Sequence, residues 1–447
     1  MHEFDNSIAN VLRVLVGQFG PALPRIHLVR DVSGQLVVVL DPDALPEAEH
    51  WSKLARTLHQ TLGIQSPGEK RVLLKESDLI SEEEVADSQD RILLDLQDPP
   101  YRAISEDIKG QVWLIDRLIT NQDWIRPPVW ETPPVPTAVA YSIKGGVGRT
   151  TTLALWAWYL ARNGHHPILV DFDIEAPGLG SALLPYEELP DYGLIDWLIE
   201  CILGKPDSGL LQECIAPWRV PQDASGSVRI IPAYGRKTKD YVAKLGRVFV
   251  PFIGPDEKIH GFAERVASLL EEVSRIPVAP TEVLIDSRAG LHDIGSAIVT
   301  RLAAEVFLFS RDDMQSWYAY KRLFSHLSMG KAVQFGNQDH DIRSRMKMVA
   351  AQLDSGEDAI RAWTSNSFDA WAEFYDEVEE NQIGFYGRDD EAAPHYPLLT
   401  LFDLQVRQFN LSDPNKRPDW RWIDKAFSDF FEAATARLGE TRQSRNA

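Results

Sequence analysis

Hydrophobic positions near the start of this chain alternate between helical and strand-like spacing. Apolar residues at helical intervals predict helices over residues 8–16 and 47–62. Short apolar runs predict strands over residues 35–40 and 72–74. We therefore expect a small α+β unit over residues 1–125.

A proline-rich stretch over residues 126–137 interrupts this pattern. It contains Pro127, Pro128, Pro133, Pro134 and Pro136. Proline has no N–H group and restricts the residue before it, so we expect an extended linker here. The acidic stretch upstream, residues 78–91, is expected to be a solvated loop or helix face.

Beyond the linker, short and nearly continuous apolar runs alternate with helical patterns. The predicted strands cover residues 138–142, 167–171, 283–286, 306–310, 348–351 and 398–402, and the clearest helices cover 151–162 and the chain from Trp420 onward. Strands that are apolar on both faces are typical of a parallel sheet covered by helices. We predict a doubly wound, mostly parallel α/β domain over residues 138–447, with insertions near 185–280 and 355–395.

A glycine-rich segment joins the first of these strands to the following helix. It consists of Lys144, Gly145, Gly146, Val147, Gly148, Arg149, Thr150 and Thr151. Glycines let backbone N–H groups turn toward phosphate oxygens, and a helix N-terminus adds further N–H groups. Arg149 stands where such loops usually place lysine, and Thr150 supplies a hydroxyl for Mg²⁺. This segment predicts a nucleoside triphosphate site.

Carboxylates end two of the later strands. Asp171 and Asp173 follow the second strand after the linker, and Asp286 ends the third. Ligands of parallel sheets lie beyond the carboxyl ends of the strands, so these side chains are expected near the glycine-rich segment. A carboxylate that ends an apolar strand is costly to desolvate unless it meets a cation.

These three motifs, in this order, resemble those of the ParA/MinD family of P-loop ATPases, whose loop reads KGGVGKTT. The resemblance covers most of residues 137–447. It implies ATP and Mg²⁺ as ligands, with Thr150, Asp171 and Asp286 around the ion and Asp173 positioning the attacking water. It also implies that Lys144 is the signature lysine, which often reaches the phosphates of the partner in an ATP-dependent homodimer.

Two arginines depart from the family pattern. Arg149 keeps the positive charge but is bulkier than lysine, so we expect nucleotide binding with slow hydrolysis. Arg288 replaces a proline common in the family's segment, and we expect it to pair with Asp312 or Asp313, with a phosphate contact as the alternative. Glu175 is expected to be solvated. Residues 352–354 and 402–405 are the candidates for contacting the base.

Composition limits the partners. The formal net charge of −20 opposes sequence-independent binding to DNA or to an anionic membrane, although a local basic patch is not excluded. We expect the basic run over residues 343–347 to be a solvated face. The C-terminal helix is expected to dock on the core instead of a membrane. With two cysteines and no apolar run of membrane-spanning length, the sequence favours a reducing cytoplasm.

Three functions fit these observations. The first is an ATPase that acts as a nucleotide-switched dimer and regulates or recruits a protein partner through the N-terminal unit or the insertions. The family resemblance further implies that this ATPase acts in a bacterial multi-gene system of the defence type. The second is a nucleotide-binding scaffold that does not hydrolyse. The third, a bacterial tyrosine kinase, is disfavoured because the chain beyond Tyr396 contains no tyrosine.

Overall fold

The computed structural model describes residues 3–45, 47–78, 91–97, 99–204, 206, 209–220, 224–254, 257–334, 342–375, 386–401, 411–413 and 416–446. The chain forms two compact units, of which the first comprises Met1–Arg126 and Met329–Gly336 and the second the rest. Most of the acidic stretch over 78–91, and the candidate base-contacting residues 402–405, lie outside the described residues.

The first unit contains a five-stranded mixed sheet in the order β3-β2-β1-β5-β4. Its strands are β1 (Ile26–Arg30), β2 (Leu36–Leu40), β3 (Leu73–Lys75), β4 (Arg91–Leu93) and β5 (Val112–Asp116), and its helices are α1 (Glu3–Phe19), α2 (Ala48–Leu62) and α4 (Pro99–Arg102). Apolar residues of α1 and α2, such as Leu12 and Leu58, share one buried cluster with Leu28 and Leu114 of the sheet. This is the α+β arrangement predicted for this part of the chain.

The second unit is built on an eight-stranded sheet in the order β15-β14-β13-β6-β12-β7-β9-β8. Its strands are β6 (Thr137–Ser142), β7 (Ile168–Asp171), β8 (Ala216–Trp218), β9 (Val228–Ile231), β12 (Val283–Asp286), β13 (Glu305–Ser310), β14 (Met346–Leu353) and β15 (Leu398–Leu401). Every neighbouring pair is parallel except β8 with β9. The predicted doubly wound, mostly parallel sheet is confirmed. Strands β8 and β9 fall within 185–280, so part of that interval extends the sheet.

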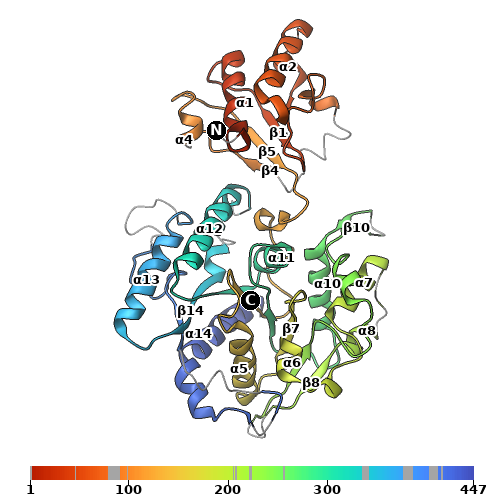
Figure 1. Ribbon diagram of the computed structural model, residues 1–447, viewed down its shortest axis with the longest axis vertical. Coiled ribbons are helices and arrows are strands. Elements are labelled where there is room, and N and C mark those ends of the chain that lie inside the picture. Colours follow the sequence, from red (N-terminus) through yellow and green to blue (C-terminus); the bar gives the residue numbers. More distant parts are fainter. Residues whose placement is uncertain are drawn as a thin grey trace. The chain divides into compact units, whose positions relative to one another are not determined.

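Helices cover both faces of this sheet (Figure 1). They are α5 (Arg149–Arg162), α6 (Leu179–Leu183), α7 (Leu194–Leu203), α8 (Leu210–Glu213), α9 (Tyr241–Leu245), α10 (Phe262–Ser274), α11 (Asp293–Thr300), α12 (Met314–Gln334), α13 (Glu357–Trp371) and α14 (Trp420–Asn446). Helices α5 and α14 pack together on one face, and α11 packs on β6 from the other. A two-stranded ribbon, β10 (Phe252–Ile253) with β11 (Ile259–His260), completes the unit.

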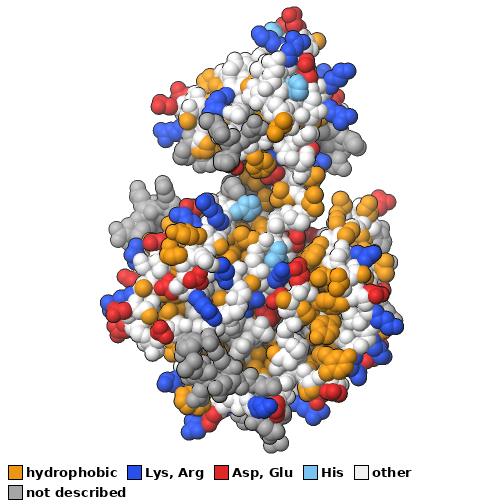
Figure 2. Space-filling view, viewed as in Figure 1, with side chains coloured by type: hydrophobic (Ala, Val, Ile, Leu, Met, Phe, Trp, Pro, Cys, Tyr) orange, Lys and Arg blue, Asp and Glu red, His pale blue; other side chains and the backbone are white. Residues whose placement is uncertain are grey.

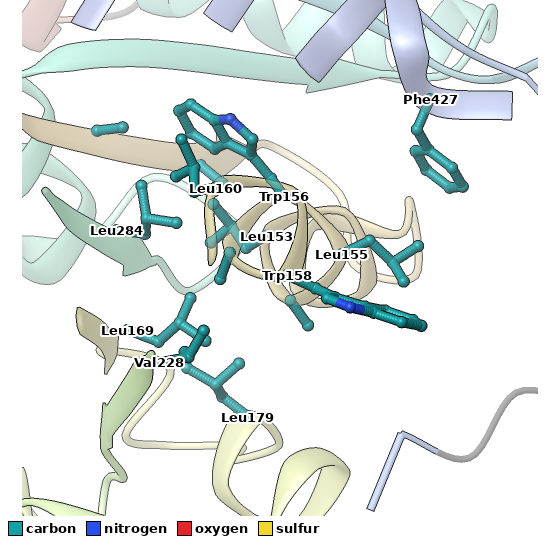
Figure 3. Close-up of a cluster of buried hydrophobic side chains, with 14 of the residues drawn as sticks. Leu153, Leu155, Trp156, Trp158, Leu160, Leu169, Leu179, Val228, Leu284 and Phe427 are labelled. Carbon is teal, nitrogen blue, oxygen red and sulfur yellow. The ribbon is translucent and has the colours of Figure 1, made fainter. Parts of the chain in front are cut away.

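Helix α5 is buried between the sheet and α14 (Figure 3). Residues 152–158 are all buried, which fits a helix that is apolar all round. Trp156 meets Phe307 of β13 and Phe430 of α14 edge-on, with ring centroids 5.6 and 5.4 Å apart. Its Nε1 donates to Thr435 Oγ1 at 2.9 Å. The predicted docking of the C-terminal helix on the core is confirmed.

The basic run over residues 343–347 is not the solvated face that the sequence predicts. Arg343 and Lys347 are buried and donate to the backbone carbonyls of Phe374 and Ala393. These two positive charges therefore lie inside the fold and do not form part of a basic surface. No helix among the described residues combines the length and apolarity needed to cross a bilayer.

Apolar side chains reach the surface of the second unit near the β10–β11 ribbon. The space-filling view shows hydrophobic side chains gathered over α7, α10 and β10 (Figure 2). Exposed apolar residues in this part of the chain include Leu203, Val242, Val250, Ile253 and Ile259. In contrast, three aromatic side chains of α13 and the turn after it, Trp363, Trp371 and Phe374, are buried and form core.

Candidate functional site

The carboxyl ends of four adjacent strands bring the predicted site residues together. Strand β12 lies between β6 and β7, and its last residue, Asp286, is in register with Asp171. The glycine-rich segment leaves β6 directly beside them, and β13 flanks β6 on its other side. The sheet order therefore places the glycine-rich backbone and the carboxylates at the same end of the strands.

The glycine-rich segment turns sharply before α5 begins at Arg149. Gly146 and Gly148 have φ values of 72° and 92°, which favour glycine. A Cβ on Gly145 or Gly146 would meet nothing within 4 Å, so this side of the loop is open. Val147 is buried and anchors the loop, and Thr151 is half-buried in the first turn of α5.

Thr150 and Asp286 form the pair expected for a divalent cation. Thr150 Oγ1 donates to Asp286 Oδ2 at 2.5 Å, and Asp286 is buried. Its Oδ1 is also buried and has no hydrogen-bond partner among the described residues. Burial raises the pKa of Asp286 to about 6, against the opposing effect of Arg149. An unpartnered buried carboxylate oxygen is unfavourable, so it fits a cation ligand.

Mg²⁺ at this pair would need further oxygens from outside the protein. Among the described residues, no three His, Cys, Asp or Glu side chains are grouped as a metal site. Mg²⁺ commonly takes one or two protein oxygens and completes its shell with phosphates and water. The residues present therefore fit a nucleotide-bound ion better than a permanent one.

Asp171 is engaged with the chain that follows β7. Its Oδ1 accepts from the Asp173 N–H and its Oδ2 from the Leu179 N–H, each at 3.1 Å. Burial, followed by the nearby charges of Asp286 and Asp173, raises the pKa of Asp171 to about 7. Both oxygens thus hold the segment over residues 172–179 in place. A role for Asp171 around Mg²⁺ stays a prediction.

Arg149 faces Asp173. Its Nη2 lies 3.7 Å from Asp173 Oδ2, and only 6% of the Arg149 side chain is exposed. Arg149 Nη1 and Asp173 Oδ1 are both buried without a hydrogen-bond partner in the described part of the chain. Burial raises the pKa of Asp173, whereas Arg149 and Arg288 act to lower it. The positive charge of Arg149 therefore partly balances the negative charge of Asp173, the residue predicted to position water.

Lys144 is exposed and contacts α12. Its Nζ donates to Gln315 Oε1 at 2.6 Å, and its backbone carbonyl accepts from Ser142 Oγ at 2.6 Å. Gln315 carries no charge, so this contact leaves the lysine's positive charge uncompensated.

The predicted pairing of Arg288 is wrong. Arg288 forms an ion pair with Glu175, so Glu175 is not simply solvated. Asp312 instead accepts from the side chains of Trp317 and Asn366, and Asp313 accepts from the Ser316 N–H at the start of α12. The Arg288 pair links the loop after β12 to the loop after β7.

Two polar residues, Arg311 and Gln352, contact both each other and the glycine-rich loop. The sequence motifs did not predict this pair. Arg311, directly after β13, donates from Nη2 to the Gly146 carbonyl at 2.7 Å and to Gln352 Oε1 at 2.5 Å. Gln352 Nε2 approaches the same carbonyl at 3.5 Å. Gln352 was a candidate for contacting the base, but Arg311 was missed. Its signal is a charged residue ending the strand adjacent to β6.

The loop after β12 is fastened to the end of β6. Tyr141 Oη donates to the Gly290 carbonyl, and the Gly290 N–H donates to the Ser142 carbonyl, each at 3.0 Å. His292 is the N-cap residue of α11, with Nε2 3.1 Å from the Ala289 carbonyl and Nδ1 accepting from the Gly295 N–H. These partners require a neutral ring protonated at Nε2, because a carbonyl only accepts and an N–H only donates.

We expect His292 to stay neutral well into the acid range. Burial, with Arg288 and Arg149 nearby, lowers its pKa to about 4. A lowered pKa means that its contribution to stability is present above about pH 6.5 and is lost as the pH falls toward 4. Titration of the ring signals by NMR, assigned with His292→Asn, measures this directly. A midpoint near 6.5 would contradict the expectation.

Comparison with known proteins gives low-identity similarities in structure. No family model matches the sequence, and no curated protein matches it. The structure is similar to pNOB8 ParA bound to nonspecific DNA, with 15% identity, a TM-score of 0.43, and coverage of 70% of this chain and 99% of that chain. It is also similar to the MinD cell division protein of Aquifex aeolicus (16%, TM-score 0.40, coverage 68% and 98%). A third similarity is to a plasmid partition protein of Borrelia burgdorferi bound to AMPPNP (13%, TM-score 0.39, coverage 67% and 99%).

Proposed function

We propose that this chain binds ATP with Mg²⁺ at the loop over residues 144–151 and hydrolyses it slowly. The hydrogen bond between Thr150 and Asp286, beside an unpartnered oxygen of Asp286, carries the proposal. It combines the hydroxyl and carboxylate that a nucleotide-bound Mg²⁺ uses, at the end of an open glycine loop.

Each part of the site has a defined task in this proposal. The N–H groups of the loop and the start of α5 bind phosphate oxygens. Thr150 and Asp286 hold Mg²⁺, which when bound neutralises charge on the phosphates. Asp173 positions the attacking water. Hydrolysis is slow because Arg149 lies against Asp173 and competes for its carboxylate.

The Arg149–Asp173 contact also favours a second candidate, a scaffold that binds nucleotide without hydrolysing it. If the arginine stays on Asp173 when nucleotide is bound, no free carboxylate is available to position water. Phosphate release by the wild-type protein separates these functions, because only the slow ATPase turns over. Comparison of Arg149→Lys with Lys144→Ala then tests whether Arg149 limits the rate or Lys144 compensates for it. Faster release in Arg149→Lys would show that Arg149 limits the rate, since lysine is shorter and presents a single point charge.

The chain acts, in this proposal, as an ATP-dependent homodimer that regulates or recruits a protein partner. The exposed Lys144 and the exposed apolar side chains of Leu291, Met314 and Tyr318 support a second copy at this edge. The exposed apolar residues near the β10–β11 ribbon support contact with another protein. The N-terminal unit is the other candidate for partner contact. We place this ATPase in a bacterial multi-gene system of the defence type.

Molecular mass in solution tests the switch. We expect a monomer without nucleotide and with ADP, and a dimer with Mg²⁺ and a slowly hydrolysed ATP analogue. Light scattering coupled to gel filtration measures both states, and equilibrium dialysis with labelled ATP measures binding separately. A protein that binds no ATP contradicts the whole proposal, whereas ATP binding by an unchanging monomer contradicts only the dimer.

A further inference from the structure

Three arginines surround the glycine-rich loop, and they differ in what they face. Arg149 faces Asp173, and Arg288 is paired with Glu175. Arg311 is exposed, and no carboxylate among the described residues lies within ion-pair distance of it. An arginine keeps its charge at any physiological pH, so Arg311 is the one of the three whose charge is uncompensated.

Only one of the two terminal nitrogens of Arg311 has hydrogen-bond acceptors among the described residues. Nη2 donates to the Gly146 carbonyl and to Gln352 Oε1. Across the described residues, Nε and Nη1 have no acceptor. A guanidinium has five N–H donors in a planar fork that matches phosphate oxygens, so the remaining donors suit an anion at the loop.

Gln352, which holds Arg311, is itself held in an unusual backbone conformation. Its φ is 55°, and the pairing of β14 with β15 shifts register between Ala351 and Leu353. Its N–H donates to Thr400 Oγ1 at 3.3 Å. A non-glycine residue at positive φ is uncommon and costs on the order of 1 kcal/mol. The bulge directs the Gln352 side chain across the loop, where its Nε2 would lie 3.3 Å from a Cβ on Gly148.

We propose that Arg311 is a polyphosphate-binding residue of this site and that Gln352 orients it. The proposal rests on nucleotide binding at the loop and adds the residue that supplies the binding charge. With Arg149 turned to Asp173, Arg311 takes the part that lysine plays in ordinary phosphate loops. Its bond to the Gly146 carbonyl also keeps that carbonyl away from the anion, because the oxygen is directed to the guanidinium.

Binding of ATP and of inorganic tripolyphosphate to Arg311→Met tests the proposal. Tripolyphosphate carries the anionic chain without base or sugar, so it isolates the charge contact. We expect both affinities to fall about ten- to hundredfold, as for loss of a charge-assisted hydrogen bond. The dependence of both affinities on salt should become shallower, since one phosphate contact is lost. Arg311→Lys should recover part of the affinity.

Two further variants separate charge from structure. Gln352→Glu places a carboxylate against Arg311 while leaving the arginine in place, so affinity for both anions should fall. Arg275→Met, at the end of α10 that precedes β12, removes an equal charge away from the carboxyl ends of the strands and should change neither affinity. Wild-type affinity for both anions in Arg311→Met would overturn this inference alone. Wild-type protein that binds neither anion would overturn the proposed function and this inference with it.

Discussion

Asp173→Asn is expected to abolish ATP hydrolysis while leaving ATP binding intact. The substitution keeps the size of the side chain and removes the charge that positions water. Loss of a general-base or water-positioning group typically lowers a rate by about 10²–10⁴-fold. ATP affinity should be unchanged or tighter, because Arg149 loses the carboxylate that it now faces. Phosphate release and equilibrium dialysis measure the two effects.

The matched control is Asp191→Asn. Asp191 is an aspartate paired with Arg236 and Lys237 outside the loops that carry Asp171, Asp173 and Asp286. This variant should hydrolyse ATP at the wild-type rate. A wild-type rate in Asp173→Asn would remove Asp173 from the reaction. Absence of turnover in the wild-type protein, with ATP still bound, would favour the scaffold.

Asp286→Asn should have opposite effects on stability without and with ligand. Burial raises the pKa of Asp286 from 3.8 to about 6 in the folded chain. A raised pKa means that its contribution to stability is present below pH 3.8 and is lost as the pH rises through 6. The neutral amide avoids this loss. At pH 8 in EDTA, the free energy of unfolding should rise by on the order of 1–3 kcal/mol.

With Mg²⁺ and ATP the order of stability should reverse. A ligand at a thousand times its Kd stabilises a protein by about 4.1 kcal/mol, which exceeds the gain expected for the amide. Wild-type protein should gain this and Asp286→Asn should not, because the amide lacks the charge that binds the ion. Thermal unfolding at pH 4 and pH 8, with and without ligand, measures all four states. Equal stabilisation of both proteins by Mg²⁺ and ATP would show that Asp286 is not a ligand.

Asp424→Asn serves as the control for charge removal alone. Asp424 is exposed on α14, so its replacement should alter neither the pH dependence nor the response to ligand.

The pKa of Asp171 is expected to change in Asp286→Asn, since the charge of Asp286 contributes to raising it. Its midpoint should therefore fall in Asp286→Asn.

Strands buried on both faces were predictable from the sequence, and half-polar ones were not. Strand β12, Val283–Asp286, is apolar until its last residue and is wholly buried. Strands β1 and β5, Ile26–Arg30 and Val112–Asp116, mix apolar and charged residues, and their pairing with each other and with β2 and β4 makes them strands. Strand β8 contains Pro217, which a sheet interior excludes, but it lies at the edge of the sheet.

The site was predictable where its residues are contiguous or end a marked strand. Gly146, Thr150 and Asp286 belong to motifs with a clear chemical purpose. Arg311 and Gln352 meet only because β13 and β14 lie beside β6, which no local pattern reveals. The orientation of Arg149 toward Asp173 is a choice of side-chain conformation, which depends on the packed neighbours instead of the sequence spacing.

The burial of most of α5 limits which parts of the second unit can move. A helix enclosed by the sheet and α14, with Trp156 fixed on three sides, has no room to slide or tilt without opening the core. The glycine-rich loop at its start is therefore held rigidly. If the proposed nucleotide binding moves any part of the site, we expect the loops after β7 and β12 to move. The Arg288–Glu175 ion pair joins those two loops, so we expect them to move together.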